Sequence, residues 1–273
     1  MVRVGVVWDR TVAFLGERTG ALMAIAFCTL VLPNAITGAL EPMRATAGTG
    51  VRGLVGLLLI VGGLVSLWGQ LAVTALALGK VEAAGAALRH GGRRLPAMIG
   101  VALVLLVAFL LATAPLAWLA MVSGGTRMDM EGVRIAMTGG RRGTIALLAI
   151  VYAALGLWMS ARLSLLMPVV VGERLGLRAI PRAFRLTRGL GLKMAAVILL
   201  YAAVLSIVTY AAQTVFGTVM LLLAGGDRPV TVASVVTALA VSCVAAAFSV
   251  LACVFLAQLL RAIRAAREGG PWA

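Results

Sequence analysis

Long apolar runs alternate with short polar connections along almost the whole chain. The runs cover about residues 19–40, 54–78, 97–122, 144–171, 194–223 and 231–260. Each run can cross a hydrocarbon core about 30 Å thick as a helix of roughly 20 residues, and a helix satisfies its own backbone hydrogen bonds in lipid. The pattern therefore predicts an all-α polytopic membrane protein with six transmembrane helices over residues 19–264 and a tail at 265–273.

The segment before the first run has a different pattern. Within residues 1–18, apolar residues recur at helical spacing from Val4 to Leu15 among charged ones. This spacing predicts an amphipathic helix that lies in the membrane interface. The first run itself contains Pro33 followed by Asn34. A helix break at this pair would make the run a re-entrant segment, so the sequence leaves open whether the run crosses the bilayer.

Composition supports a membrane location. Apolar residues make up 62% of the chain and charged residues 12%, so the bilayer is its expected solvent. The net charge is +15, and the cations lie in the gaps between apolar runs, where they set topology and contact phospholipid headgroups. No basic domain with interleaved aromatic residues is present, which argues against a nucleic-acid partner. The three scattered cysteines indicate neither a disulfide framework nor a metal site.

The cations are distributed unevenly between the two sets of connections. The N-terminus, the connections after the second and fourth runs, and the C-terminus together hold sixteen Lys and Arg residues. The other three connections hold seven. Because cytoplasmic loops carry the excess of Lys and Arg, both termini are predicted to be cytoplasmic.

The most basic stretch is the connection after the fourth run. Four of its arginines follow one another at spacings of 4, 4 and 3 residues, which places them on one side of a helix, and a fifth lies close behind; they are Arg174, Arg178, Arg182, Arg185 and Arg188. Such a helix on the membrane surface attracts anionic lipid by about 1 kcal/mol per cation. Generic anchoring of a cytoplasmic loop is the alternative. Pro181 is predicted to start this helix.

The chain also contains a weak internal repeat. Ala87-Leu88-Arg89 precedes the third run, and Ala183-Phe184-Arg185 precedes the fifth run 96 positions later. The second and third runs are therefore similar to the fourth and fifth, and each pair is joined by a basic amphipathic elbow. Paired units of this kind are common in transporters but occur in other membrane proteins too. Chance similarity of two apolar–basic–apolar units is the alternative.

The second elbow has a distinctive order of residues. Its span ends at Pro168, Glu173 follows, Gly176 supplies a turn, and Ala183-Phe184-Arg185 leads to Gly189. This order resembles the signature of the glycerophosphoryl diester phosphodiesterase membrane-domain family and of related six-span bacterial inner-membrane proteins. Thr187 stands near a position where the family often has Ser, with a one-residue slip in spacing. The resemblance implies a bacterial cytoplasmic (inner) membrane location and an architecture rather than an activity. The phosphodiesterase activity of multidomain relatives belongs to a soluble domain that these 273 residues do not contain.

Residues that could carry catalysis are few. Hydrolysis of a phosphodiester by the related catalytic type would need histidines and a carboxylate cluster that holds a metal. The chain has one histidine, His90, and its closest acidic pair, Asp129 and Glu131, would not share a face of a helix. A single histidine at the interface cannot complete a catalytic triad. We therefore expect no enzymatic activity, no metal and no cofactor.

Arg162 is the one charged residue placed well inside a run, about nine residues before the run ends at Val171. A charge at such depth costs about 2.5–3.5 kcal/mol on insertion scales. Its partner could be backbone carbonyl groups, Gln70, Gln213 or a lipid phosphate. The alternative is that the side chain extends to the interface and packs within the bundle.

Small residues form a stripe along the sixth run. They repeat every four positions and are Ser234, Ala238, Ser242 and Ala246. Small residues at this spacing allow two helices to approach closely. We expect the stripe to pack within this chain, with a dimer contact as the alternative.

These features favour a non-catalytic integral inner-membrane protein that contacts anionic lipids, with a role in membrane or envelope homeostasis or as a scaffold for an unknown protein partner. The alternative is a small transporter or lipid-translocating protein with a central path near Arg162, Gln70 and Gln213. The runs contain no acidic residue for an ion relay, which weighs against transport. A membrane-embedded lipid enzyme is a third reading, without a clear nucleophile. A polar cavity that reaches the bilayer centre would favour transport.

Overall fold

The computed structural model describes residues 4–46, 48–122, 126–129, 132–135, 142–173, 176–187, 191–224 and 232–267. Within these residues, six helices are long and apolar enough to cross a membrane, which confirms the predicted all-α polytopic fold. The spans are Thr19–Leu40, Thr49–Ala77, Ala84–Pro115, Ile150–Glu173, Met194–Val219 and Ser234–Ala266.

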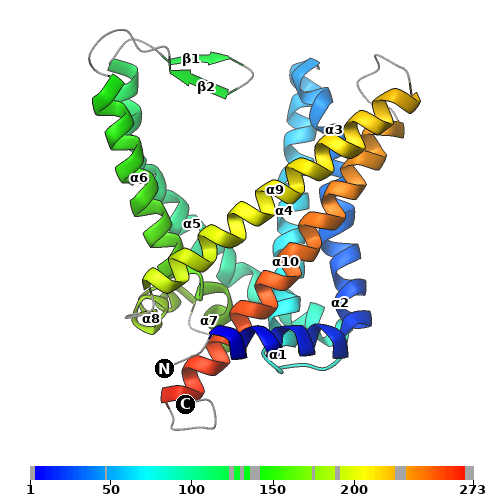
Figure 1. Cartoon of the computed structure of the whole chain (residues 1–273), viewed down its shortest axis with the longest axis vertical. Helices are drawn as coiled ribbons and strands as arrows, with labels where there is room; N and C mark the ends of the chain where they lie inside the picture. Colours follow the sequence, from blue (N-terminus) through cyan, green and yellow to red (C-terminus); the bar gives the residue numbers. More distant parts are fainter. Residues whose placement is uncertain are drawn as a thin grey trace.

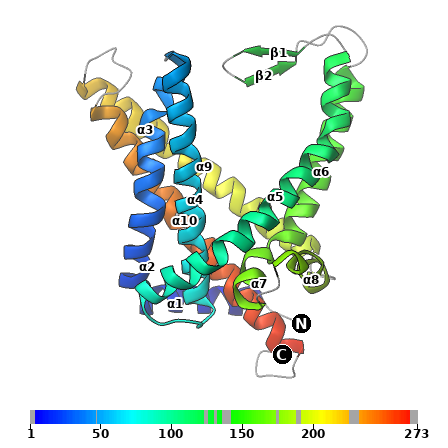
Figure 2. The same ribbon diagram turned by 180° about the vertical axis from the view of Figure 1, so that it is seen from behind.

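The chain rises and descends three times from a common base (Figure 1). Its elements in order are α1 (Val4–Glu17), α2 (Thr19–Ala26), the π-helical segment η1 (Phe27–Val31), α3 (Leu32–Thr46), α4 (Thr49–Ala77), α5 (Ala84–Val122), β1 (Thr126–Asp129), β2 (Gly132–Ile135), α6 (Arg142–Leu163), α7 (Leu166–Glu173), the 3₁₀ segment η2 (Gly176–Arg178), α8 (Ala179–Leu186), α9 (Gly191–Ala224) and α10 (Val232–Arg267). Both ends of the chain lie at the base, together with α7 and α8. The strands β1 and β2 pair antiparallel at the opposite end, within a stretch that the sequence marks only as polar (Figure 2).

Helix α1 lies across the base, as expected of an interfacial helix (Figure 1). Val7 and Thr11 form its buried side, and Val7 belongs to the core cluster that includes Leu259 and Leu260 of α10. Trp8 and Val12 are about half exposed, at 47% and 50%. An apolar surface left open on such a helix fits the boundary between headgroups and acyl chains.

The first span is continuous through its proline. The helix changes to a π-helical turn over Phe27–Val31 and resumes as α3 at Leu32, one residue before Pro33. A π turn shifts the hydrogen-bond pattern by one residue, at the point where Pro33 supplies no N–H. Thr37 donates its hydroxyl to the carbonyl oxygen of Pro33 at 3.0 Å. The span therefore continues from Thr19 to Leu40, and the re-entrant alternative is not supported.

The fourth run is divided, where a single helix over 144–171 was predicted. Helix α6 ends at Leu163, a turn follows at Ser164 and Leu165, and α7 begins at Leu166. Pro168 explains the break, because it has no N–H to donate to the carbonyl oxygen of Ser164, four residues earlier, and its ring would clash with that carbonyl group. The result is a short helix at the base that leads into the second elbow.

Close contacts between helices lie where α4 carries glycine. A Cβ built at Gly69 would overlap Thr29 Oγ1, and one at Gly62 would lie 3.1 Å from a methyl group of Thr37. Helix α4 also packs closely against α5, where a Cβ built at Gly91 would lie 3.0 Å from the backbone nitrogen of Ala72. Glycine at these contacts thus allows α4 to pack closely against both the first and the third span.

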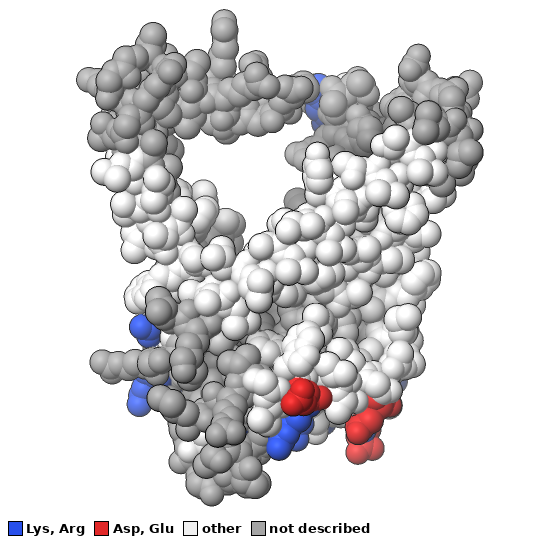
Figure 3. All heavy atoms as spheres, in the orientation of Figure 1, with Lys and Arg blue, Asp and Glu red and all other residues white. Residues whose placement is uncertain are grey.

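The buried core lies toward the base, and the outer parts of the helices separate. Only 6% of the residues in the most apolar part of α5, and 6% in that of α9, are buried. Figure 3 shows an opening between α6 on one side and α9 on the other. Large side chains such as Leu111 of α5 (70% exposed) and Ile207 of α9 (68%) are not covered by protein. Acyl chains are the solvent for this surface.

The two elbows contact their preceding spans in equivalent ways. Trp68 of α4 donates its indole N–H to the carbonyl oxygen of Leu88 at 2.7 Å. Arg162 of α6 donates Nη1 to the carbonyl oxygen of Phe184, 96 positions after Leu88, at 3.4 Å. The alanine before each accepting residue is completely buried. In each elbow, a side chain of the preceding span thus donates to the carbonyl oxygen that follows a buried alanine.

Candidate lipid-headgroup site

The candidate site is built on the second elbow, where the chain reverses at the base. Gly176 has φ +52°, a left-handed conformation that glycine adopts without a steric penalty. The chain changes direction between α7 and η2, and η2 continues directly into α8. The predicted glycine turn is therefore present at the predicted position.

Helix α8 is strongly amphipathic. Its buried residues are Ala179, Ala183 and Leu186, at spacings of four and three. Arg182 and Arg185 lie beside this buried side rather than within it: the side chain of Arg182 is 42% exposed, and Arg185 is exposed. The burial of one side of α8 thus turns the cationic side outward at the base of the protein.

Pro181 is the third residue of α8, whereas it was predicted to start the helix. The difference is small in energy, because the N–H groups of the first helical turn have no partner within the helix. A proline is therefore tolerated at this position without loss of a backbone hydrogen bond.

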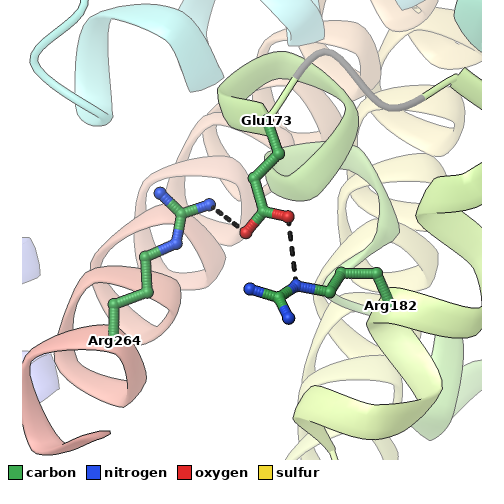
Figure 4. Close-up of polar contacts among 3 residues, drawn as sticks. All are labelled: Glu173, Arg182 and Arg264. Atoms are coloured by element: carbon green, nitrogen blue, oxygen red, sulfur yellow. Dashed lines mark hydrogen bonds and ion pairs between the residues drawn. The ribbon is translucent and has the colours of Figure 1, made fainter. Parts of the chain in front are cut away.

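Glu173 connects three helices at the base (Figure 4). Its Oε1 accepts a hydrogen bond from Nη2 of Arg264 on α10 at 2.7 Å, and its Oε2 accepts one from Nε of Arg182 on α8 at 3.1 Å. The glutamate side chain is 17% exposed, against 30% for Arg264 and 42% for Arg182. One partly buried carboxylate thus fixes α7, α8 and α10 relative to one another, with two guanidinium groups for one negative charge.

A pocket of about 370 Å³ lies beside this ion-pair network. Its lining residues are Glu173, Arg178, Pro181, Arg182 and Arg185. Three guanidinium groups against one carboxylate leave a formal charge of +2 on its walls. Guanidinium groups bind phosphate and carboxylate oxygens through paired N–H donors. The charge and the donors of the pocket are therefore suited to an anion.

Arg162 lies apart from this pocket. Its guanidinium carbon is 5.0 Å from the centre of the Trp158 ring, and Nη1 contacts the Phe184 carbonyl oxygen near the end of α8. The C-terminal end of a helix carries partial negative charge, and an aromatic face attracts a cation. Of the partners considered from sequence, the structure provides a backbone carbonyl group, and Arg162 connects α6 to α8.

Several predicted residues fall elsewhere. Arg174, Arg188 and Gly189 lie outside the described residues, as does Glu131, and the side chain of Asp129 is not described. Pro168 is buried in α7. His90 lies in the first part of α5. Among the described residues, no group of three His, Cys, Asp or Glu side chains is placed to hold a metal ion.

The stripe on α10 contributes both to packing and to a second pocket. Ala246 is buried, at 3% exposure, and Ala238 lies 3.5 Å from a Cβ built at Gly38 of α3. Ser234, Ala238 and Ser242 also line a pocket of about 470 Å³. Gln213 lines this pocket too, whereas Gln70 and Arg162 are not among its lining residues. The three polar residues considered for a central path therefore do not meet in it.

Two features of these sites were missed from the sequence. Arg264 stood out only as one of the basic residues at the C-terminal end, and nothing in the sequence links it to a carboxylate 91 positions earlier. The signal was Glu173 itself, the single acidic residue of a strongly basic connection. Asn34 was read as part of a possible helix break, whereas it lines the second pocket.

Comparison of the chain with protein-family models, with curated proteins and with solved structures gave no match.

Proposed function

We propose that this protein is a non-catalytic component of the bacterial inner membrane that holds an anionic lipid headgroup at its second elbow and serves membrane or envelope homeostasis. The observation that carries the proposal is the pocket of about 370 Å³ walled by Arg178, Arg182 and Arg185. The pocket lies beside the junction of α7 and α8, at the end of the fourth span. A phosphodiester from the adjoining leaflet would meet these cations directly.

Charge supports an anionic ligand. Glu173 neutralises part of the positive potential, but its two oxygens already accept hydrogen bonds from Arg182 and Arg264. Arg178 and Arg185 belong to the same pocket and are exposed. Each cation near the surface contributes about 1 kcal/mol toward anionic lipid. The pair is therefore expected to favour an anionic headgroup over a zwitterionic one by about 2 kcal/mol, or roughly 30-fold.

Orientation is part of the proposal. Both chain ends lie on the side of the basic elbows (Figure 1), and cytoplasmic sides of inner-membrane proteins carry the excess of Lys and Arg. We therefore place this side in the cytoplasm. A fluorescent protein that matures only in the cytoplasm, fused to the C-terminus, should fluoresce. An intact fusion that does not fluoresce would place the C-terminus outside the cytoplasm and refute this orientation.

Similarity to the glycerophosphoryl diester phosphodiesterase membrane-domain family remains a proposal too. It is supported by the roles of its signature residues in this chain. Pro168 lies in the short helix after the break in the fourth run, Glu173 joins three helices, and Gly176 makes the turn into the elbow. All three act on the geometry of the elbow, which is what a shared architecture requires.

Lipid retention tests the function. The protein is reconstituted with equal amounts of phosphatidylglycerol and phosphatidylethanolamine, extracted gently and analysed by native mass spectrometry. Wild type should retain phosphatidylglycerol selectively. Arg178→Gln/Arg185→Gln should lose about 30-fold of this preference, because about 2 kcal/mol of attraction is removed. Arg178→Lys/Arg185→Lys keeps the charge and should retain most of it.

The matched control is Arg261→Gln, which removes an exposed cation from the same end of the protein but outside the pocket lining. Its lipid preference should change by at most about fivefold, since a single cation contributes about 1 kcal/mol. Unchanged phosphatidylglycerol retention in the double glutamine variant would refute the proposal. Equal losses of lipid preference in the double variant and in the Arg261 control would show that any exposed cation at this end has the same effect, and would refute a specific site at the pocket.

A further inference from the structure

The second pocket lies within the membrane-spanning part, away from the basic elbows. Helices α3, α9 and α10 form its wall, and its volume is about 470 Å³, within the usual range for small-molecule sites. Asn34 stands 15 residues after the first residue of the first span, or about 22 Å along the helix. Ser242 stands 25 residues before the end of α10 at the base. The pocket is therefore in the half of the bilayer opposite the elbows.

Every residue that lines this pocket is uncharged. Asn34 of α3 and Gln213 of α9 supply side-chain amides, and Thr237 and Ser242 of α10 supply hydroxyl groups. An ion inside a bilayer needs a counter-charge close by, and the lining provides none. Amides and hydroxyls both donate and accept hydrogen bonds. The chemistry therefore fits a neutral ligand with hydroxyl or ester oxygens.

The two amides have hydrogen-bonding capacity left over. Both side chains are exposed, and neither has a hydrogen-bond partner among the residues that the structure describes. An amide facing hydrocarbon without a partner is strongly unfavourable. Two such groups from different helices, at one pocket of this size, are a stronger sign of a ligand than either would be alone.

The surroundings of the pocket indicate where the ligand comes from. The same three helices expose large apolar side chains, among them Ile36 (52%), Val215 (58%) and Leu239 (39%). A ligand that satisfies the amides and also covers this surface must be amphiphilic, with a polar part and hydrocarbon chains. A free polar solute would satisfy only the pocket.

We propose that this pocket binds the neutral glycerol–ester region of a membrane lipid, with diacylglycerol as the simplest such molecule. Its hydroxyl and ester carbonyl oxygens would meet Asn34 and Gln213, and its acyl chains would lie along α3, α9 and α10. This site goes beyond the anionic-headgroup site, because it is uncharged, lies on other helices and is in the opposite half of the bilayer.

Photolabelling tests the proposal on the full chain reconstituted in nanodiscs. The probe is diacylglycerol with a diazirine close to the ester on one acyl chain. Crosslinks mapped by mass spectrometry should concentrate on the pocket segments of α3, α9 and α10. Asn34→Leu/Gln213→Leu should reduce them at least fivefold. The control Thr214→Val changes a neighbouring exposed residue of α9 that bonds only its own helix, and should leave the pattern unchanged.

Competition distinguishes the two sources of the same neutral chemistry. Unlabelled diacylglycerol should displace the probe, whereas free glycerol at millimolar concentration should not. Displacement by glycerol but not by diacylglycerol would overturn the lipid assignment. So would undiminished labelling in the double leucine variant, or a crosslink pattern equal to that of a photoreactive alkane. Should the double variant unfold, Ala245→Leu, which fills the pocket and keeps both amides, must give the same loss.

Discussion

Gly69 is the position where the packing of the bundle can be tested most sharply. A Cβ added there would overlap Thr29 Oγ1 and lie 2.7 Å from Thr29 Cβ. The threonine is 4% exposed, and its hydroxyl donates to the carbonyl oxygen of Ile25 at 2.6 Å. Rotation of the threonine side chain cannot relieve the clash, because Thr29 Cβ itself is too close, so α4 and the first span must move apart.

The magnitude for Gly69→Ala follows from two opposing terms. Overpacking of a tight contact costs about 1–3 kcal/mol, and replacement of glycine by alanine within a helix gains about 0.5–1 kcal/mol. A net loss of about 1–2 kcal/mol in the free energy of unfolding is expected. Gly63→Ala, six residues earlier in α4, meets nothing within 4 Å and should stabilise the protein by the propensity gain alone.

The assay is unfolding by sodium dodecyl sulfate in mixed micelles, followed by tryptophan fluorescence. Gly69→Ala should be less stable than wild type and Gly63→Ala more stable. The free energies of unfolding of the two variants should differ by about 2 kcal/mol. Thr29→Ala introduced into Gly69→Ala removes the overlapping hydroxyl and should restore part of the loss. A Gly69→Ala protein as stable as Gly63→Ala would show that the close approach of α4 to the first span does not exist.

Three further changes test the elbows. Trp68→Phe should cost about 0.5–1.5 kcal/mol in the same titration, because the hydrogen bond from the indole N–H to the Leu88 carbonyl oxygen is lost; full stability would mean that this contact is unimportant. Gly176→Ala should cost about 1–2 kcal/mol from its positive φ alone, since a Cβ would meet nothing within 4 Å, and an unchanged midpoint would contradict the turn. Glu173→Gln should destabilise the protein by about 1–3 kcal/mol, yet raise phosphatidylglycerol retention roughly fivefold by removing the negative charge of the pocket. If phosphatidylglycerol retention instead falls together with stability, the effect of Glu173 on the charge of the pocket is not separate from its effect on the fold.

The spans were predictable from sequence because lipid imposes a simple rule on composition. Any run of this length must be helical, whatever its detailed packing. The turn at Gly176 was predictable for a similar reason, since only its own backbone is involved. The effect of Pro33 was not, because the π-helical turn that accommodates it depends on hydrogen bonds shifted over the preceding residues.

Contacts between residues on different helices could not be predicted from the sequence. Arg162 was assigned several alternatives, and the structure selects the Phe184 carbonyl oxygen because α8 folds back beneath α6. Arg264 meets Glu173 because α10 descends beside α7, a neighbourhood set by the whole bundle. The small-residue stripe on α10 was expected to close a helix contact, but the same side chains also border a pocket, and periodicity alone does not distinguish the two.

The outer parts of α5 and α6 lie apart from the rest of the bundle, and this determines what covers their side chains. Protein contacts hold the helices at the base, whereas the outer parts of α5 and α9 are covered by little protein. Acyl chains therefore supply most of the contacts of these outer parts. The lipid next to these helices is thus part of what packs against the protein, and a change of lipid or detergent changes the surroundings of side chains such as Leu111 and Ile207.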